Sequence, residues 1–472
     1  MGADEFREHG HAAVEWIARY LEGIEARPVL SRATPGQVRA GIPDAPPEEA
    51  ESLTDILADI DRVVMDGITH WNHPGFMAYF AISGSGPGIL GEMLTAAFNA
   101  NGMLWKTSPA VTELEEATLD WLRQMLGLDA GLRGILMDTA SMATFSAMVA
   151  ARERATGGET RRRGMDGHRL RAYTSEEAHS SVIKAAISCG IGEEGIRRIR
   201  ADGAFCMDAD ALSAAIEEDI AAGWTPLFVV ATVGTTSTTS VDPVGEIVAA
   251  CRPHGIWTHV DAAYAGMAAI ADEYRWALEG CESVDSLVVN PHKWLFTPID
   301  CSAFYVRDPA ALQEAFSLVP EYLRTEDRDV TDYMDWGLQL GRRFRALKLW
   351  MVIRRFGRAG LAARIREHIR LAHVFAARVE SDDRFELMAP APFSTICFRY
   401  RPHGMSDEPA LRDLNAAILD AVNATGTVYL SHTALRGAYV LRLAVGNLRT
   451  TKRHIEQAWV AVTESLGHLP IH

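Results

Sequence analysis

The sequence predicts an α/β fold in which a mostly parallel sheet is covered by helices on both faces. From about residue 130 onward, short apolar runs alternate with helical stretches such as 210–222 and 245–254. This alternation is typical of parallel strands joined by crossover helices, because such strands are buried on both faces. The runs expected to be strands are Gly134–Met137, Leu170–Tyr173, Gly195–Ile199, Leu227–Thr232, Ile256–Val260, Ser286–Val289 and Ser302–Val306.

Length and composition limit the class of protein. A chain of 472 residues is too long for one hydrophobic core and predicts two or three domains. The formal net charge of −16 argues against a nucleic-acid or anionic-membrane partner, since either favours a basic face. No apolar run approaches the ~18 residues of a membrane span, and no signal peptide is visible. We expect a soluble cytoplasmic protein whose scattered cysteines are reduced thiols.

The N-terminal region is expected to lack a core of its own. Residues 11–26 carry apolar side chains at helical spacing, and residues 52–68 resume an amphipathic helix. The segment 28–47 between them is rich in Pro, Gly and Ala and is typical of an extended arm. Because two helices joined by a long arm cannot bury a core, we predict that they pack on a partner subunit in an obligate homodimer.

Two motifs ahead of the sheet are better explained by packing than by cofactor binding. His70–Phe80 places six aromatic or His side chains in eleven residues, but no nearby carboxylate or Cys completes a metal site. We expect a pocket wall or an interface there, and no metal. Gly86–Gly91 matches G-x-G-x-x-G but lacks the preceding buried strand and the later acidic residue of a dinucleotide site. We expect a loop leading into a helix at 89–98.

The C-terminal part is expected to form a smaller α+β domain. A helical stretch over 341–380 is interrupted at Gly357–Gly360, and later strands and helices alternate at 394–400, 409–424, 438–443 and 452–466. We therefore expect an N-terminal helical dimerisation segment (1–85), a large α/β domain (86–347) and a C-terminal α+β domain (348–472).

Chemically distinct groups follow the predicted strands at their carboxyl ends. Ala140 and Ser141 open a helix, where free N–H groups and the helix dipole favour a phosphate. His179 begins a later helix, and Asp261 stands at the mouth of a buried strand. Lys293 follows another strand beside a Trp, where poor solvation would lower the ammonium pKa and make the amine nucleophilic.

These groups together fit pyridoxal 5′-phosphate (PLP). In open α/β sheets, ligands bind outside the carboxyl ends of the strands. Lys293 would hold the cofactor covalently, and Asp261 would pair with the ring nitrogen and keep it protonated. His179 would stack on one ring face, with Ala263 against the other. Each residue alone is more often an ordinary packing or capping residue, but their order along one sheet favours PLP.

Several motifs resemble those of the group II PLP-dependent amino-acid decarboxylases, with the aromatic-L-amino-acid decarboxylases as the nearest branch. They are Ala178–Ser181 (AHSS), His259–Gly266 (HVDAAYAG), Asn290–Trp294 (NPHKW) and Gly341–Trp350 (GRRFRALKLW). The resemblance runs from roughly residue 5 to the C-terminus. It implies the PLP-dependent transferase fold type I (aspartate-aminotransferase-like), a swapped N-terminal segment and a homodimer with a shared active site.

The resemblance also implies roles for individual residues. Ala140, Ser141 and His292 would bind the phosphate, and Thr236 would lie near the substrate carboxylate or a cofactor oxygen. Tyr322, in Pro-Glu-Tyr-Leu, matches the tyrosine of the mobile catalytic loop. The implied catalytic residues are Lys293, His179, Tyr322 and Asp261. The implied cofactor-binding residues are Ala140, Ser141, His179, Thr236, Asp261, Ala263, Asn290, His292 and Lys293.

The substrate pocket is expected to favour a large ring. Ile82 occupies a position where catechol-handling relatives carry a hydroxyl residue, and Met103 replaces an aromatic residue. Gly341 stands where histidine- and tyrosine-preferring relatives often carry Ser, and Gly there accompanies bulkier rings such as indole. These features rank tryptophan first, then phenylalanine, then tyrosine or dopa. The complete expected pocket is Trp71, Tyr79, Phe80, Ile82, Met103 and Gly341.

The expected activity is PLP-dependent decarboxylation of an aromatic L-amino acid to an arylalkylamine and carbon dioxide. The first alternative is an aldehyde synthase, which also deaminates the same substrates oxidatively; Tyr322 and His179 are both present, which favours simple decarboxylation. A glutamate-type decarboxylase fits less well, because the aromatic pocket offers no partner for a side-chain carboxylate. A PLP-binding protein without turnover is the remaining alternative, and an intact catalytic loop argues against it.

Overall fold

The computed structural model describes residues 1–165, 167–318 and 330–468, and within them the chain forms two compact units. The terminal unit comprises Met1–Ala81, Val374–Glu386 and Phe398–His472, and the sheet unit comprises Ile82–His373 and Leu387–Cys397. Both units therefore draw on separated stretches of chain. The expected division into an N-terminal helical dimerisation segment (1–85), a large α/β domain (86–347) and a C-terminal α+β domain (348–472) stays a prediction.

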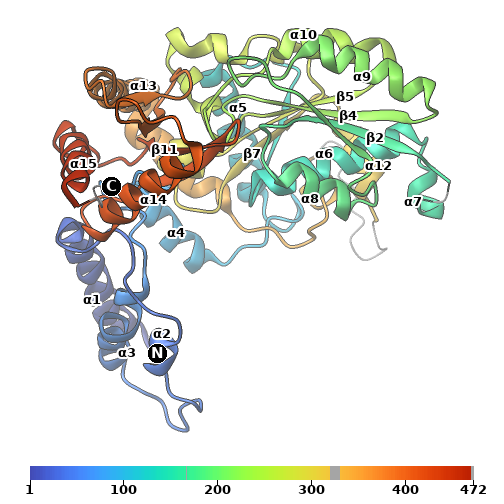
Figure 1. Ribbon diagram of the computed structural model, residues 1–472. Helices are drawn as coiled ribbons and strands as arrows, with labels where there is room; N and C mark the ends of the chain where they lie inside the picture. Colours follow the sequence, from blue (N-terminus) through green and yellow to red (C-terminus); the bar gives the residue numbers. More distant parts are fainter. Residues whose placement is uncertain (166, 319–329, 469–472) are drawn as a thin grey trace. The chain divides into compact units, whose positions relative to one another are not determined.

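The central sheet of the sheet unit has seven strands within the described ranges, in the order β1-β7-β6-β5-β4-β2-β3 (Figure 1). Neighbours from β3 to β6 pair in parallel, and β7 is antiparallel to both β1 and β6. The prediction of a mostly parallel sheet is confirmed. The strands are β1 (Arg133–Met137), β2 (Leu170–Ser175), β3 (Ile196–Ile199), β4 (Thr225–Thr232), β5 (Trp257–Asp261), β6 (Ser286–Val289) and β7 (Ser302–Val306).

Burial on both faces explains why these strands were visible as apolar runs. Every residue of β5, β6 and β7 is buried. Figure 1 shows α9 (Ala209–Ala221) and α10 (Val244–Cys251) on one face, and α6 (Ala140–Ala155), α8 (Ser181–Ser188) and α12 (Pro309–Phe316) on the other. Small buried residues of α6, such as Ala143 and Ala147, let this helix approach the sheet closely.

Helix α4 (Gly86–Phe98) starts three residues before the predicted position 89, so the expected entry loop is already helical. Pro87 is compatible with a first helical turn, because the N–H it lacks would have no partner there. A Cβ at Gly88 would lie 2.3 Å from Pro298 Cδ, and one at Gly91 would lie 2.6 Å from Lys348 Cα. The glycine spacing therefore serves close packing of α4.

Among the described residues, the remaining α-helices of the sheet unit are α5, which packs on β1, the short α7 and α11, and the long α13. Helix α13 contains one residue with non-helical backbone angles, Gly357 (φ 63°, ψ 165°), where an interruption was expected. Their bounds are α5 (Pro109–Leu126), α7 (Glu159–Arg163), α11 (Pro291–Trp294) and α13 (Arg345–Glu380), the last of which continues into the terminal unit.

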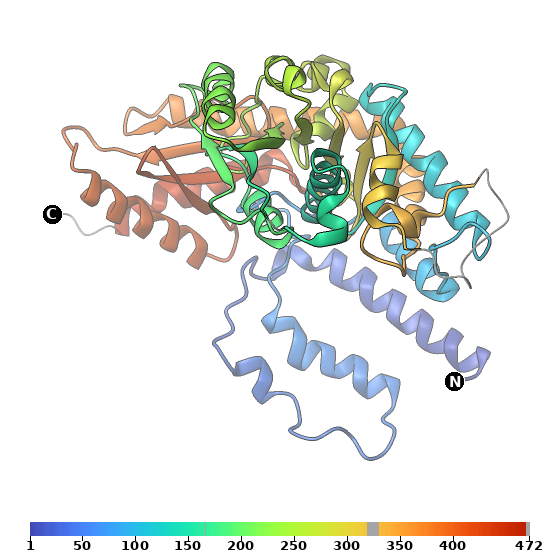
Figure 2. The same cartoon turned by 90° about the vertical axis from the view of Figure 1, so that its right-hand side faces the viewer.

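The N-terminal helices α1 (Ala3–Glu22) and α3 (Leu53–Asp59) lie side by side (Figure 2). The Trp16 indole N–H donates to the Asp61 carboxylate at 3.1 Å. The predicted helix 11–26 starts earlier and ends before Gly23, and the extended arm contains the short helix α2 (Gln37–Ala40). No residue of α1 is buried, although the helix carries large apolar side chains. The pair has little core of its own.

A four-stranded sheet with the order β10-β11-β9-β8 forms the rest of the described strand structure, and α14 packs on β11. The predicted strands and helices of this region are present, and β8 and β10 were not predicted. The elements are β8 (Phe385–Leu387), β9 (Thr395–Tyr400), α14 (Glu408–Ala424), β10 (Ser431–Leu435), β11 (Ala438–Ala444) and α15 (Lys452–Ser465).

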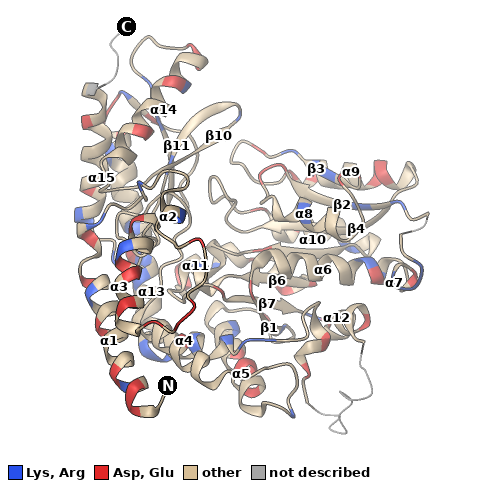
Figure 3. Cartoon of the chain, turned by 90° about the horizontal axis from the view of Figure 1, so that it is seen from below, with Lys and Arg blue, Asp and Glu red and all other residues tan. Residues whose placement is uncertain are grey.

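Charged residues of both signs occur along α1, whereas α3 carries only acidic ones, Asp55 and Asp59 (Figure 3). Among the helices of the described ranges, none combines the length and the apolar character that a bilayer crossing requires.

Candidate active site

The carboxyl ends of the parallel strands bring three of the predicted catalytic residues, Asp261, Lys293 and His179, to one edge of the sheet unit. Thr232 of β4 is paired with Asp261 of β5, and Asp261 is paired with Val288 of β6. The three strands therefore end at the same level. Lys293 follows β6 on the short helix α11, and His179 follows β2, the neighbour of β4.

Backbone hydrogen bonds connect the turn that carries Asp261 to the turn that carries Lys293. The Ala263 N–H donates to Asp261 Oδ1 at 3.1 Å, and the Asn290 N–H donates to the Ala263 carbonyl at 3.2 Å. The Lys293 N–H in turn donates to the Asn290 carbonyl at 2.9 Å. Asp261 is only 7% exposed and Lys293 is half-buried, so both side chains are partly or largely shielded from solvent.

His179 lies within electrostatic range of both residues. Its ring is accessible at the sheet edge, yet the surrounding protein removes enough hydration to lower the pKa of His179. The Asp261 carboxylate opposes this shift, and the Lys293 ammonium adds to it. His179 Nδ1 accepts the Ser181 N–H at 3.1 Å, so the proton of the neutral ring is on Nε2. Three predicted catalytic residues are thus brought together.

His292 and Asn290 supply polar atoms beside the lysine. The Cys301 N–H donates to His292 Nδ1 at 3.0 Å, which leaves Nε2–H as the available donor of the neutral ring. Burial lowers the pKa of His292 to about 4, with Lys293 adding to the shift. Asn290 Oδ1 is buried and has no hydrogen-bond partner in the described part of the chain. A buried amide oxygen normally has one, so a polar ligand fits this place.

The N-terminus of α6 lies next to the start of β7, which follows the hydrogen-bond partner of His292. Ala140 and Ser141 occupy its first positions, where backbone N–H groups have no partner within the helix. The Asp138 carbonyl just before them accepts the Ser302 hydroxyl at 3.2 Å, and Ser302 follows Cys301, to which His292 is bonded. Ala140 is half-buried and Ser141 is exposed, so the start of this helix is accessible to a phosphate group.

Thr236 is exposed on the turn that follows β4. Asp242, at the other end of this turn, accepts the Thr232 N–H and the Met207 N–H, each at 2.7 Å. Burial raises the pKa of Asp242 to about 7. Sequence patterns did not reveal this carboxylate, because a single acidic residue in a polar turn carries no distinctive signal.

The expected substrate-pocket residues are divided between the two units. Trp71, Tyr79 and Phe80 belong to the terminal unit, where the Trp71 and Tyr79 rings stack with centroids 6.0 Å apart. Two unpredicted residues join them: the Tyr429 hydroxyl lies 3.4 Å from that of Tyr79, and the Arg442 guanidinium lies 4.7 Å from the Phe80 ring centroid. Arg442 interrupts an otherwise apolar strand, and this interruption is the feature of the sequence that could have identified it.

Met103 and Gly341 of the sheet unit meet at Asn101. The Asn101 amide N–H donates to Met103 Sδ at 3.4 Å, and a Cβ at Gly341 would lie 3.9 Å from the same amide nitrogen. Arg342 holds this corner: its N–H donates to Asn101 Oδ1 at 2.9 Å, and its guanidinium pairs with the fully buried Glu115 at 2.6 Å. Ile82 is half-buried in the sheet unit, and Tyr322 lies outside the described residues.

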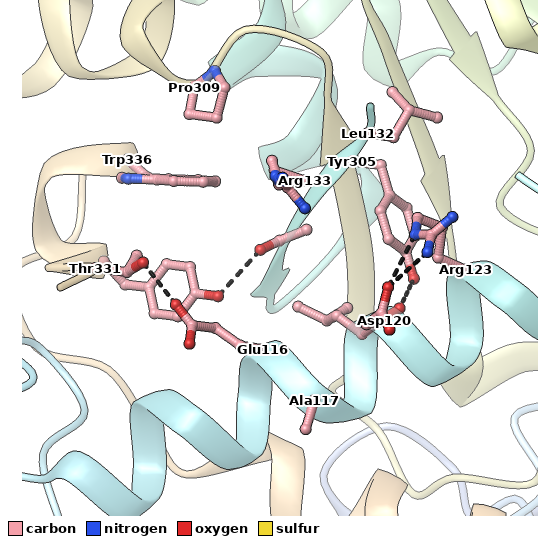
Figure 4. A pocket seen from close by; sticks show the side chains of 13 residues that line it. Glu116, Ala117, Asp120, Arg123, Leu132, Arg133, Tyr305, Pro309, Thr331 and Trp336 are labelled. Atoms are coloured by element: carbon pink, nitrogen blue, oxygen red, sulfur yellow. Dashed lines mark hydrogen bonds and ion pairs between the residues drawn. The ribbon is translucent and has the colours of Figure 1, made fainter. Parts of the chain in front are cut away.

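A separate cavity of about 540 Å³ lies along α5 and the start of β1, away from the carboxyl ends of the parallel strands. None of the predicted site residues lines it. Figure 4 shows that several of its polar side chains are paired within the lining: Thr331 donates to Glu116 at 2.6 Å, and Arg123 pairs with Asp120 at 2.6 Å. Among the described residues, no group of three or more His, Cys, Asp or Glu side chains could hold a metal ion.

The mostly parallel sheet and its similarity to solved decarboxylase structures define the fold as that of the type I PLP enzymes. Residues 35–401 match the pyridoxal-dependent decarboxylase conserved domain. The chain therefore belongs to the pyridoxal-dependent decarboxylase family, in its aromatic amino-acid branch, and is a carboxy-lyase with PLP as its cofactor.

Relatives of different activity are similarly close. Tyrosine decarboxylase 2 of Narcissus pseudonarcissus is 42% identical over 470 residues, which cover 97% of this chain and 93% of that protein. Phenylacetaldehyde synthase of a Rosa hybrid cultivar is 40% identical over 482 residues, covering 98% and 94%. The crystal structure of Catharanthus roseus tryptophan decarboxylase in complex with L-tryptophan aligns with a TM-score of 0.94 at 40% identity, covering 100% of this chain and 99% of that one. The resemblance seen in the motifs is confirmed.

Proposed function

We propose that this decarboxylase acts on L-tryptophan in preference to phenylalanine, tyrosine or dopa, and releases tryptamine and carbon dioxide. The observation that carries the proposal is the corner formed by Met103, Asn101 and Gly341. Because Gly341 has no side chain and a Cβ there would meet only Asn101, at 3.9 Å, this corner leaves room for a large ring. Met103 adds a flexible apolar surface that suits a bicyclic ring.

The residues at the strand ends fit PLP, as the buried acceptor of Asn290 and the helix start at Ala140 indicate. In this proposal Lys293 holds the cofactor covalently, Asp261 pairs with the ring nitrogen, and His179 and Ala263 contact the two ring faces. The phosphate is bound by His292 and by the N–H groups of Ala140 and Ser141, with Thr236 near the substrate carboxylate or a cofactor oxygen. Bound PLP supplies an electron sink for the electron pair that remains when carbon dioxide leaves.

Proton control is assigned to His179 and Tyr322. The lowered pKa of His179 keeps its ring neutral at pH 7, and the proton on Nε2 can be donated toward the reacting end of the substrate. Tyr322 is proposed from the sequence motif as the general acid that delivers a proton to the substrate Cα, with His179 as the next candidate. Exclusion of water and oxygen during this delivery favours the amine product.

Decarboxylation without deamination is favoured over aldehyde synthesis because both His179 and Tyr322 are present. Similarity to the Rosa phenylacetaldehyde synthase is nearly as high as to the decarboxylases, so product analysis has to decide between these activities. Since the chain is an enzyme of the decarboxylase family, the non-catalytic alternative is set aside.

The test is incubation of the PLP-loaded protein with tryptophan, phenylalanine, tyrosine, dopa and glutamate separately, with amine and aldehyde measured by mass spectrometry. We expect tryptamine with the highest kcat/KM and no aldehyde. Gly341→Ser should reduce the preference for tryptophan over tyrosine by about tenfold, the effect of a small volume change in an apolar pocket. A wild-type preference for tyrosine or phenylalanine, or aldehyde as the main product, would contradict the proposal.

We also propose a homodimer with a shared active site. Large apolar side chains on α4 are exposed at i, i+3, i+4 and i+8 spacing and form one stripe, Leu90, Met93, Leu94 and Phe98. Because such a stripe is costly in water, a second copy of the chain would cover it. A cytoplasmic location stays a prediction.

A further inference from the structure

The residue that follows the lysine, Trp294, is held on two sides. It is fully buried, and its indole stacks on the Tyr264 ring with centroids 4.5 Å apart and planes 7° from parallel. The indole N–H donates to His368 Nδ1 at 2.9 Å. His368 is itself only 3% exposed, so both partners of this hydrogen bond are removed from water.

The two partners of Trp294 come from different parts of the sheet unit. Tyr264 lies three residues after Asp261, and its hydroxyl is hydrogen-bonded to the Ser394 hydroxyl at 2.6 Å. His368 lies on α13, where Phe296 also meets it edge-on with centroids 5.7 Å apart. One rigid indole therefore joins the segment of the aspartate, the segment of the lysine and a long helix.

This contact matters because the helix that carries Lys293 is short. Helix α11 has four residues, Pro291–Trp294, and a single helical turn has little stability of its own. The lysine side chain is a flexible four-carbon stem, so the position of its amine depends on how firmly the backbone is held. The stacked and hydrogen-bonded Trp294 supplies that support directly beside the lysine.

We propose that Trp294 and His368 are positioning residues that hold Lys293 and Asp261 at a fixed separation for the cofactor. The inference rests on the proposed function, in which these two residues hold PLP. The hydrogen bond requires an unprotonated His368 Nδ1, so the ring carries its proton on Nε2 when the contact is formed. Loss of the contact loosens the lysine turn, and the holoenzyme then releases its cofactor faster.

The test compares PLP release from variants that change one atom group at a time. Trp294→Phe keeps an aromatic ring for stacking but removes the indole N–H. His368→Leu removes the acceptor, whereas His368→Gln offers an amide oxygen in its place. The matched control is Trp257→Phe: the Trp257 indole is also buried and donates to Ser286 Oγ at 2.8 Å, but it lies at the opposite end of β5 from Asp261.

We expect Trp294→Phe and His368→Leu to release PLP about tenfold faster than wild type, because each removes one buried hydrogen bond. Visible absorbance follows the release while an excess of a PLP-binding compound takes up the free cofactor. The double variant should be no faster than either single variant, and His368→Gln should restore most of the retention. Trp257→Phe should lower the melting temperature of the cofactor-free protein without changing PLP release.

Trp294→Phe and His368→Leu could instead release PLP at the wild-type rate while their melting temperatures fall as in Trp257→Phe. This result would show that the contact only stabilises the fold. If Trp294→Phe does not fold, the His368→Leu and His368→Gln pair decides the question by the same measurement. Borohydride reduction and peptide mass analysis of the wild type provide a separate check: absence of cofactor on Lys293 overturns the proposed function, whereas its presence with unchanged release overturns only the positioning role.

Discussion

Two histidines of the sheet unit are kept neutral by burial. His259 is fully buried, with Nδ1 bonded to the Ser286 hydroxyl at 2.8 Å and Nε2 to the Thr144 hydroxyl at 3.3 Å. Burial lowers its pKa to about 4, as it does for His292. A neutral ring can satisfy both hydroxyl partners, whereas a charged ring in this place would lack hydration.

This burial predicts a specific acid sensitivity. The pKa of His259 falls from 6.5 in an unperturbed histidine to about 4, so the unfolded chain binds more protons than the native chain between these values. The stabilisation is fully present above pH 6.5 and is lost as pH falls toward 4, by about 3 kcal/mol for this residue. Melting temperatures between pH 7.5 and 4 should show the loss.

His259→Asn should reduce this pH dependence while lowering stability at neutral pH, because the asparagine side chain does not titrate whereas contributions such as that of His292 remain. The control is His403→Asn, which makes the same substitution at an exposed position. An identical slope in wild type and His259→Asn would show that His259 is not the titrating group.

The charge of Asp261 can be tested without changing its shape. Asp261→Asn keeps an oxygen for the Ala263 N–H, which donates to Oδ1 at 3.1 Å, but removes the negative charge. Since breaking a buried charge pair costs several kcal/mol, we expect PLP affinity to fall by about 10²-fold or more, and turnover with it. Fluorescence titration with PLP and an amine assay measure the two effects. Near-normal values of both would remove Asp261 from the mechanism.

At the scale of elements, α4 depends on glycine for its close approach to α13. A Cβ at Gly91 would lie 2.6 Å from Lys348 Cα, and the buried Lys348 is also paired with Glu92 of α4. Gly91→Ala should therefore destabilise the protein by about 1–3 kcal/mol, since the backbone has to shift to admit the methyl group.

The matched control is Gly86→Ala on the same helix, because a Cβ there meets no atom within 4 Å. Denaturant unfolding followed by circular dichroism compares the two variants. Equal midpoints would show that the contact between α4 and α13 is not close in solution.

At the scale of the whole molecule, the exposed apolar stripe of α4 predicts self-association. Leu94 and Phe98 are 44% and 60% exposed within a single chain. We expect sedimentation and light scattering to give twice the 51.7 kDa chain mass. Leu94→Glu combined with Phe98→Glu should shift the protein toward monomer and reduce activity, because the shared active site would be incomplete.

Ile187→Glu serves as the control, since Ile187 of α8 is 50% exposed but does not belong to the stripe. This variant should remain dimeric. A wild-type protein that is active as a monomer at assay concentration would contradict the proposed dimer.

Local pattern was sufficient for much of the sheet unit. Strands β6 and β7 coincide with the predicted runs, and the other strands of this sheet differ by one or two residues at their ends. Burial on both faces produces continuous apolar runs, so the strands are visible without any knowledge of their partners. The positions of Asp261, His179 and Lys293 followed from the same signal, since parallel strands place their carboxyl ends at one edge.

The sequence by itself therefore determined the α/β fold class, the strand-end residues and the decarboxylase family. Only the tertiary structure revealed that Trp294 bonds to His368, 74 residues away, that Asp242 holds the turn after β4, and that Arg342 supports the Gly341 corner. It also showed that β7 runs antiparallel to β6. An apolar run does not indicate the direction in which a strand runs. The physical reason is that periodicity records which face of an element is buried, whereas the partner of a buried polar group is decided by how distant elements pack.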